Sequence, residues 1–335
     1  MAKKDIIVIG GSAGSQSALK QIIGDLPADL PASIFIATHV PSHVGGYLAQ
    51  LLEKSCAIPV LTAVDGQPIE RNRIYVAVPD HHLLVIDGTV RLGNGPRENM
   101  ARPAIDPLFR SAALSYGPRT VGVILSGLLN DGASGLGAIK ACGGTAIVQN
   151  PLEAVEDQMP LAALETVDAD QVAPASGLGQ AISEVVTENA GPPVAPSESL
   201  QLEVEIASGA RLGSEELLKI ADAVPLTCPD CQGVLSEVRN EKPLRYRCQI
   251  GHAVTAEIVD ARADRVEEAL RLALRVMEER VTLVARMAED ARRTGRSSVA
   301  HLYESRSEEY SRYAKVLRDA AVALLRDRNA SDEGG

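Results

Sequence analysis

Asp5-Ile6-Ile7-Val8-Ile9-Gly10-Gly11-Ser12-Ala13-Gly14 is the stretch that decides the fold. Its apolar part, residues 5–10, is an unbroken run of the kind found in strands that are buried on both faces of a parallel sheet. Glycines at positions 10, 11 and 14 let the chain turn sharply after this strand. A helix is predicted next, over residues 16–24. This strand–turn–helix unit is the building block of a doubly wound α/β fold.

The same alternation continues as far as residue 186. Further strands are predicted at residues 33–37, 59–63, 73–78, 82–86, 120–126 and 144–148, and further helices at 45–54, 103–116, 131–142, 160–166 and 177–188. Strands separated by helices imply right-handed crossovers and a mostly parallel αβα sandwich, which we assign to residues 1–188. The Asp87-Gly88 pair predicts a hairpin turn between Ile86 and Val90.

The composition changes after the α/β region. Pro- and Ser-rich sequence predicts a linker over residues 189–224, and a Cys/His cluster marks a small module at 225–256. Apolar residues at alternating spacings of three and four predict a helical hairpin over residues 257–328, with a break at 292–298. We expect residues 329–335 to form a disordered tail.

The composition also excludes several classes of protein. The chain of 335 residues has a net charge of −11, which argues against a nucleic-acid-binding protein. No apolar run approaches the ~18 to 20 residues that a membrane helix needs. The N-terminus lacks the apolar region and cleavage site of a signal peptide. We therefore expect a cytoplasmic protein that neither binds nucleic acid nor inserts into a membrane.

Three polar residues stand where predicted strands end. Ser12 follows the first strand, His39 follows the second, and Asp131 follows the buried strand at 120–126. A hydroxyl, an imidazole and a carboxylate are the parts of a nucleophile, a general base and an orienting acid. Because the carboxyl ends of parallel strands share one edge of the sheet, these side chains can meet in one crevice. The sequence therefore predicts a serine hydrolase that acts by acyl transfer.

Each of these residues also has a purely structural interpretation. Ser12 fits a helix cap or a phosphate-binding loop, His39 fits the end of a strand, and Asp131 fits a helix N-cap. The loop lacks the spacing of a P-loop or a dinucleotide site, and no acidic residue ends the second strand, so a nucleotide-binding fold is disfavoured. Other histidines are less well placed to act as the base, namely His43, His81 and His82.

Taken in order, these segments resemble the catalytic domain of the chemotaxis protein-glutamate methylesterase family. The stretches that carry the resemblance are residues 8–14, 38–41, 64–66, 75–77, 80–83, 102–109, 122–127, 130–133, 143–144, 148–149 and 159–160. The resemblance implies a triad of Ser12, His39 and Asp131. It also implies hydrolysis of glutamyl methyl esters on chemoreceptors, with deamidation of receptor glutamines as a second activity. The expected partner is a methylated chemoreceptor or a similar helical signalling protein.

The sequence departs from the pattern of the family on the substrate side. Ala13 and Ser15 replace residues that are often Thr and Gly, Thr38 stands where Gln is frequent, and Leu128-Leu129 replaces a usual Met-Gly pair. Ala13, Leu128 and Arg102 are our candidates for contact with substrate, and Arg102 fits a structural ion pair equally well. The alternative function is a non-catalytic signalling scaffold in which Leu128-Leu129 closes off the triad.

The family also carries an N-terminal receiver domain in its usual form. Here the first catalytic strand begins at Asp5, so we expect a member without a receiver domain and without phosphorylation control within this chain.

Cys228, Cys231, Cys248 and His252 have the spacing of a metal site. Two ligands with two residues between them form a turn that holds one metal ion, and the second pair completes a tetrahedral Cys₃His set, which is typical of zinc. Four filled positions predict a structural zinc ion rather than a catalytic one. Reduced structural cysteines and a redox Cys-x-x-Cys are the alternatives.

The helical hairpin at residues 257–328 has two interpretations. It fits a solvated bundle with mixed charges on its outer face, and it fits a surface for homodimerisation or for docking to a helical partner.

Overall fold

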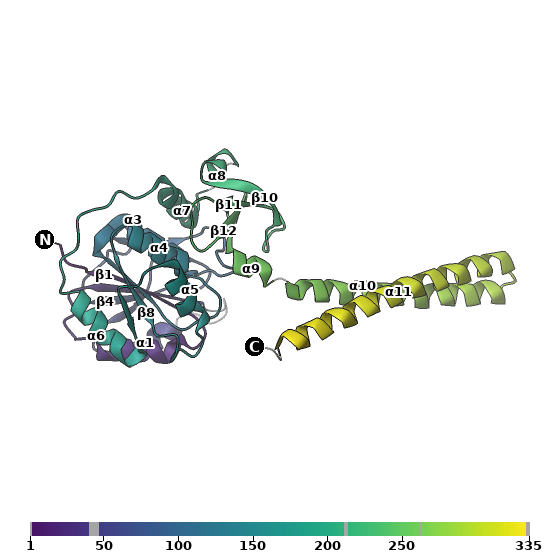
Figure 1. The fold of residues 1–335 in the computed structure, drawn as a ribbon, viewed down its shortest axis with the longest axis horizontal. Helices are drawn as coiled ribbons and strands as arrows, with labels where there is room; N and C mark the ends of the chain where they lie inside the picture. Colours follow the sequence, from purple (N-terminus) through teal and green to yellow (C-terminus); the bar gives the residue numbers. More distant parts are fainter. Residues whose placement is uncertain (1, 40–46, 211–213, 262, 333–335) are drawn as a thin grey trace. The chain divides into compact units, whose positions relative to one another are not determined.

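The computed structural model describes residues 2–39, 47–210, 214–261 and 263–332. The chain divides into two compact units, Met1–Val259 and Asp260–Gly335. Figure 1 shows the α/β core and the small antiparallel sheet in the first unit and the paired long helices of the second.

A parallel sheet of seven described strands forms the centre of the first unit. In spatial order β3-β4-β2-β1-β7-β8-β9, the strands are Val60–Thr62, Arg73–Val76, Ser33–Thr38, Ile6–Gly11, Thr120–Ile124, Thr145–Gln149 and Gln171–Ala173. All neighbouring strands in this order run parallel. From β1 the chain first builds the sheet on one side and then, from β7 onward, on the other. The edge beyond β1 and β7 is therefore a topological switch point, where α/β proteins bind their ligands.

Helices cover both faces of this sheet (Figure 1). They are α1 (Ser15–Asp25), α2 (Tyr47–Glu53), α3 (Ile105–Tyr116), α4 (Ala133–Ala141), α5 (Gln158–Thr166) and α6 (Ala175–Val185). Ile7 and Ile9 of β1 pack in the core that holds α1 and α6, whereas Ile6 and Val8 pack in the core that holds α3 and α4. Burial on both sides explains the apolar run at residues 6–10 and confirms the predicted α/β sandwich.

Other expectations for this region differ in detail. The hairpin of β5 (His82–Ile86) and β6 (Thr89–Gly93) turns at Asp87-Gly88 as predicted, but it forms a separate two-stranded sheet. The sequence reading missed the short strand β9. The predicted helix at 45–54 is present as α2, and its first two positions lie outside the described residues.

The predicted linker at residues 189–224 is wrong beyond residue 197. The chain there forms α7 (Glu198–Ser208) and α8 (Ser214–Ile220), and β10 begins at Ala221. The side chain of Ser197 caps α7 by accepting from the Leu200 N–H at 3.1 Å. Leu200 and Val204 then pack into the same core as α3. Because Pro-rich sequence precedes α7, the sequence did not indicate this short amphipathic helix, which packs as part of the α/β domain.

The Cys/His cluster lies on an antiparallel sheet, which we call the ribbon. Its described strands are β10 (Ala221–Thr227), β11 (Val234–Val238), β12 (Arg245–Cys248) and β13 (Ala253–Thr255), and the short helix α9 (Ala256–Asp260) follows. The ribbon is joined to the α/β domain by buried ion pairs. Arg245 and Arg247 of β12 are each 1% exposed or less, and both pair with Glu203 of α7.

Glu203 is the shared carboxylate of this buried network. It accepts from Arg245 Nη2 at 2.7 Å and from Arg247 Nε at 3.2 Å, and Arg110 of α3 lies 3.7 Å away. Burial acts to raise the pKa of Glu203, but the surrounding guanidinium groups outweigh it and hold this pKa far below its usual range. The carboxylate is therefore ionised and compensates several buried positive charges.

We expect Glu203→Ala to lower the free energy of unfolding by about 3–5 kcal/mol, because it leaves buried arginines without their partner. Urea denaturation of the full chain measures this change. Glu205→Ala is the matched control, since Glu205 is exposed on the same helix, and we expect it to change the stability by less than about 0.5 kcal/mol. Equal effects of the two substitutions would contradict this account.

The second unit is a hairpin of α10 (Ala263–Arg293) and α11 (Ser297–Asp332). Gly295, with φ +72°, lies in the turn between them. Small residues such as Ala288, Ala291 and Ala300 are buried along these helices. The hairpin thus begins later than predicted, since residue 257 belongs to α9. The predicted disordered tail is wrong up to Asp332, where α11 ends, and residues 333–335 lie outside the described residues. No helix among the described residues is long and apolar enough to cross a membrane.

Candidate active site

Ser12, His39 and Asp131 lie together at the carboxyl-terminal edge of the parallel sheet. Ser12 Oγ is 3.0 Å from His39 Nδ1, and His39 Nε2 is 2.7 Å from Asp131 Oδ2. Ser12 follows β1, His39 follows β2 and Asp131 follows β7, so the three residues surround the topological switch point. The structure thus brings together the three residues that the sequence singled out from distant segments.

The loop that carries Ser12 is held against the end of β7. Ser12 N donates to Ser126 O at 2.9 Å, and Ser126 Oγ donates to Ala13 O at 2.7 Å. Gly14 has φ +76°, and a Cβ there would lie 2.4 Å from the Cβ of Val155. A glycine is therefore required at position 14 both by the backbone conformation and by the available space. These contacts fix the Ser12 hydroxyl between α1 and β7 and leave its residue partly exposed.

Asp131 is buried and accepts several hydrogen bonds besides the one from His39. Asn99 Nδ2 donates at 2.8 Å, and the backbone N–H groups of Ile105 and Asp106 donate at 2.7 and 3.2 Å. Burial acts to raise the pKa of Asp131, but His39 and these donors outweigh it and lower the pKa to about 2. Asp131 is therefore a fixed carboxylate. It accepts from the first N–H groups of α3, whereas the N-cap of α4 is Gly132.

His39 is in contact with both of its partners through opposite ring nitrogens. When Nε2–H donates to Asp131, Nδ1 is free to accept the proton of Ser12. Chymotrypsin-type proteases use the two ring nitrogens in the opposite order. Burial acts to lower the pKa of His39, but the hydrogen bond and charge of Asp131, together with the charge of Asp106, raise it above 6.5. The imidazole is thus made a stronger base.

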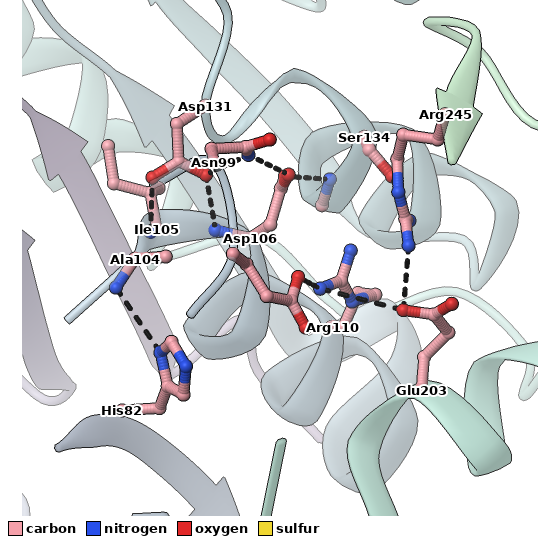
Figure 2. A network of polar contacts seen from close by, with 12 residues as sticks. His82, Asn99, Ala104, Ile105, Asp106, Arg110, Asp131, Ser134, Glu203 and Arg245 are labelled. Carbon is pink, nitrogen blue, oxygen red and sulfur yellow. Dashed lines mark hydrogen bonds and ion pairs between the residues drawn. The ribbon is translucent and has the colours of Figure 1, made fainter. Parts of the chain in front are cut away.

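A further carboxyl lies beside the triad. Asp106 Oδ1 accepts from Gly135 N at 2.7 Å, and Asp106 Oδ2 accepts from Asn99 Nδ2 at 3.0 Å. Burial and the neighbouring charge of Asp131 raise the pKa of Asp106 to about 7. Figure 2 shows Asn99 between the two carboxyl groups. Sequence reasoning missed Asn99, Asp106 and Ser126. Asp106 lies in the stretch 102–109 and Ser126 in the stretch 122–127, both of which carry the family resemblance. Asn99 lies outside these stretches.

The remaining candidates occupy separate positions. Leu128 is 46% exposed and Ala13 is partly exposed next to Ser12. Arg102 is half-buried and donates to Gly95 O at 3.0 Å, so its contact with substrate stays a prediction. His82 is fully buried and bonds Pro96 O through Nε2 at 2.9 Å. His81 Nδ1 lies 3.1 Å from Pro79 O, and His43 lies outside the described residues.

The Cys₃His residues converge at the ribbon, with their potential ligand atoms all within 4.8 Å of one another. Cys231 Sγ and Cys248 Sγ are 3.6 Å apart, and His252 Nδ1 lies 3.5 Å from Cys248 Sγ and 3.8 Å from Cys228 Sγ. Zn–S bonds of about 2.3 Å and a Zn–N bond of about 2.0 Å in a tetrahedron place sulfur atoms about 3.8 Å apart and sulfur and nitrogen about 3.5 Å apart. The donor set and its dimensions therefore fit a zinc ion.

The carboxylate of Asp230 lies on the side of the His252 ring that faces away from the thiols. His252 Nε2 is 3.8 Å from Asp230 Oδ2, while Nδ1 faces the thiols. A carboxylate near the outer nitrogen of a metal-ligating histidine is a frequent arrangement, because it orients the ring.

The α/β domain has relatives among known proteins. Residues 7–182 match the family model described as CheB methylesterase. A protein of Anaeromyxobacter dehalogenans named protein-glutamate methylesterase/protein-glutamine glutaminase 2 is 35% identical over 184 residues, which cover 55% of this chain and 54% of that protein. A Leptospira interrogans protein that is provisionally named for the same two activities is 41% identical over 169 residues, which cover 50% of this chain and 88% of the relative.

The fold has a counterpart among solved structures. The crystal structure of the Thermotoga maritima CheB methylesterase catalytic domain matches with a TM-score of 0.53 and 33% sequence identity, and the match covers 56% of this chain and 100% of that domain. The Anaeromyxobacter protein and other curated relatives are matched over only about half of their own length. Since the family model spans more than half of the sequence, the chain belongs to the CheB methylesterase family.

Proposed function

We propose that this chain is a protein-glutamate methylesterase that hydrolyses glutamyl methyl esters on chemoreceptor-type proteins. The observation that carries the proposal is the continuous path of hydrogen bonds from Ser12 through His39 to Asp131. The activities in the names of the relatives support the same substrate class. They also support deamidation of receptor glutamines as a second reaction at the same site.

The proposed reaction is acyl transfer through Ser12. His39 Nδ1 takes the hydroxyl proton while Ser12 Oγ forms a bond to the ester carbonyl carbon, and the ionised Asp131 stabilises the imidazolium. The bond to the methoxy oxygen then breaks, and methanol leaves with the proton from His39. Water attacks the acyl-enzyme with His39 again as base, which frees the glutamate carboxylate and restores Ser12. With a glutamine substrate the leaving group is ammonia.

Backbone donors are required for the oxyanion that forms on the carbonyl. The N–H groups of Ser12 and Gly127 already donate to the carbonyls of Ser126 and Glu156. We therefore propose the N–H of Ala13 as an oxyanion donor. Leu128, exposed at the same edge of the sheet, is proposed to contact the substrate near its ester group. Nothing in the described part of the chain favours the non-catalytic alternative, because Ser12 is partly exposed.

Release of methanol from methylated chemoreceptor tests this proposal directly. Full-length protein incubated with receptor-containing membranes that carry glutamyl methyl esters is expected to release methanol in proportion to enzyme concentration. Absence of methanol with every methylated receptor tested, from a protein that is folded and metal-loaded, would contradict the proposed substrate class.

We expect the kcat/KM for ester hydrolysis to fall toward acid pH with a midpoint above 6.5, because His39 must be neutral to accept the proton of Ser12. The pKa of His39 is raised from 6.5 chiefly by Asp131, against the lowering effect of burial. Asp106, with a pKa near 7, titrates in the same range, so the midpoint belongs to the coupled group rather than to one residue. A pH–rate profile between about pH 5 and pH 9 measures it, and a rate that stays constant through this range would contradict a histidine base.

We propose that the ribbon binds one structural zinc ion through Cys228, Cys231, Cys248 and His252. The support is the donor set, the distances of 3.5 to 3.8 Å between three pairs of its atoms, and the carboxylate of Asp230 near His252. In this arrangement the zinc stabilises the ribbon and takes no part in acyl transfer. The cytoplasmic location expected from the sequence stays a prediction.

We propose that the helical hairpin mediates homodimerisation. Exposed apolar side chains recur along one face of α10 at steps of four and seven, namely Leu272, Val276, Leu283 and Met287. Leu283 is 58% exposed although it is large and apolar. A second copy of the hairpin would cover this stripe as in a four-helix bundle.

Leu283→Lys in the full chain is expected to halve the solution mass measured by light scattering, because it places a charge in the proposed contact. Thr282→Lys is the matched control, since Thr282 lies next in the chain but off the stripe and is exposed. A monomeric wild type, or an unchanged mass in the Leu283→Lys variant, would contradict dimerisation through this face.

A further inference from the structure

The ribbon contacts the residues that hold the catalytic acid. Asn99 N donates to Ala253 O of β13 at 2.8 Å, and Ala253 N donates to Arg97 O at 3.3 Å. Two residues further along, Thr255 Oγ1 donates to the side-chain oxygen of Asn130 at 2.7 Å. The start of α9 adds a third contact, because Asn130 Nδ2 donates to Glu257 Oε2 at 2.5 Å. One short segment, residues 253–257, therefore reaches two asparagines of the α/β domain.

Both asparagines determine where the Asp131 carboxylate lies. Asn99 Nδ2 donates to Asp131 Oδ1 at 2.8 Å and to Asp106 Oδ2 at 3.0 Å, so this amide links the two carboxyl groups (Figure 2). Asn130 precedes Asp131 directly, and it is 2% exposed. Holding the amide of Asn130 against β13 and α9 therefore fixes the backbone from which the catalytic carboxylate projects.

The turn that carries Asn99 is also held by the ribbon. Asn99 and Met100 both have positive φ, at +50° and +65°, and Glu98 and Ala101 on either side exchange backbone hydrogen bonds at 3.2 and 2.9 Å. Asparagine adopts this left-handed conformation readily, but methionine does so rarely, so the turn carries some strain at Met100. The ribbon supports the turn from outside through Ala253 and through Arg247, which pairs with Glu98 at 3.0 Å.

Two of the metal ligands are chain neighbours of these supporting residues. Cys248 follows Arg247 at the end of β12, and His252 precedes Ala253 at the start of β13. A metal ion that binds both ligands fixes the end of one strand relative to the start of the next. The same bond thus fixes Arg247 against Glu98 and Ala253 against Asn99.

We propose that the metal-loaded ribbon is a positioning element of the esterase, which sets the place of Asp131 through Asn99, Asn130 and Thr255. The inference rests on the proposed catalytic role of Ser12, His39 and Asp131. Loss of the metal releases residues 97–101, and the carboxylate then no longer holds the ring of His39 in line with Ser12. The metal controls the activity of the triad without contacting the substrate.

The first test compares zinc-loaded full-length protein with the same protein after treatment with a chelator. Metal content is measured on both samples, and hydrogen exchange reports on residues 97–101, where Asn99 N is bonded to Ala253 O. We expect exchange in this segment to become at least about 10-fold faster on metal loss, with β1 and β7 still protected. Re-addition of zinc is expected to restore protection. This readout does not depend on the catalytic role of Ser12.

The second readout is the rate at which a fluorophosphonate labels Ser12, which depends on proton transfer to His39 but not on the receptor. We expect metal removal to slow labelling by about 10- to 100-fold. This is the range typical of losing residues that hydrogen-bond to a functional side chain and orient it. If residues 97–101 open while the wild-type Ser12 is unreactive even with zinc, the triad proposal fails and the structural coupling stands.

A matched pair of substitutions tests the contact in the folded, zinc-loaded protein. Thr255→Val removes the hydroxyl that donates to Asn130 and keeps the shape of the buried side chain, whereas Thr255→Ser keeps the hydroxyl. We expect Thr255→Val to retain a full complement of zinc and to label about 10-fold more slowly. Thr255→Ser is expected to label within about twofold of the wild-type rate.

Several results would overturn the proposal. Metal-free protein with unchanged exchange at residues 97–101 and unchanged labelling contradicts it. So does a loss of protection that extends through β1 and β7, because the metal would then hold the whole domain rather than this segment. Equal labelling rates in Thr255→Val and Thr255→Ser would contradict the assignment of Thr255 as a positioning residue.

Discussion

Ser12→Ala is expected to reduce methanol release from methylated receptor by about four to six orders of magnitude, the loss that follows when a serine nucleophile is removed from a triad. His39 and Asp131 remain in place in this variant, but neither can form the acyl-enzyme. The substitution removes one hydroxyl from a partly exposed residue, so we expect the free energy of unfolding to change by less than about 1 kcal/mol. The assay compares initial rates at equal concentrations of folded enzyme.

Ser17→Ala is the matched control for this variant. Ser17 is exposed on α1, the helix that follows Ser12. Within the part of the chain that the structure describes, its hydroxyl makes one long contact, at 3.4 Å, to Gly14 O. We expect it to release methanol at the wild-type rate. If Ser12→Ala retained more than about one hundredth of the wild-type rate, Ser12 would not be the nucleophile.

Asp131→Asn is expected to lower kcat by about 10⁴-fold, because an amide favours the wrong orientation or tautomer of the histidine. The structure adds a second reason. Asp131 accepts from His39, Asn99 and the backbone N–H groups of Ile105 and Asp106. An amide in its place turns N–H groups toward other N–H groups, so a donor is left without an acceptor. We therefore also expect a loss of about 1–3 kcal/mol in the free energy of unfolding.

Asp157→Asn provides the control for charge at the same edge of the sheet. Asp157 is exposed just before α5, so its substitution removes one negative charge without touching the triad. We expect its kcat to stay within about twofold of wild type. Equal losses in Asp157→Asn and Asp131→Asn would mean that charge at this edge, rather than the orientation of His39, governs the rate.

The sequence could predict what depends on local pattern. The run at residues 5–10 identified β1 because a strand between two helical layers is apolar on both faces. Ser12, His39 and Asp131 could be chosen because each lies on the segment that follows a parallel strand, and parallel strands end at one edge. The Cys₃His set could be chosen because ligand spacing in a turn is a local property.

What the sequence could not predict depends on contacts between distant segments. Glu203 has the sequence context of an ordinary helical glutamate, yet it is buried against Arg245 and Arg247, which lie more than forty residues away. Asn99 lies in a loop with no periodic pattern, and its contact with Asp131 follows from a left-handed backbone that the ribbon supports. The Pro-rich segment before α7 resembles a linker. The apolar face of α7 is short, and it packs against α3 only in the folded domain.

The proposed reaction requires Ser12 to be the nucleophile, and a fluorophosphonate reports on this role without a receptor. Peptide mapping by mass spectrometry after treatment of the zinc-loaded full chain locates the adduct and gives its rate of formation. We expect one adduct, on Ser12, that forms at least about 10³-fold more slowly in His39→Ala. An adduct on another residue, no adduct at all, or an unchanged rate in His39→Ala would contradict it.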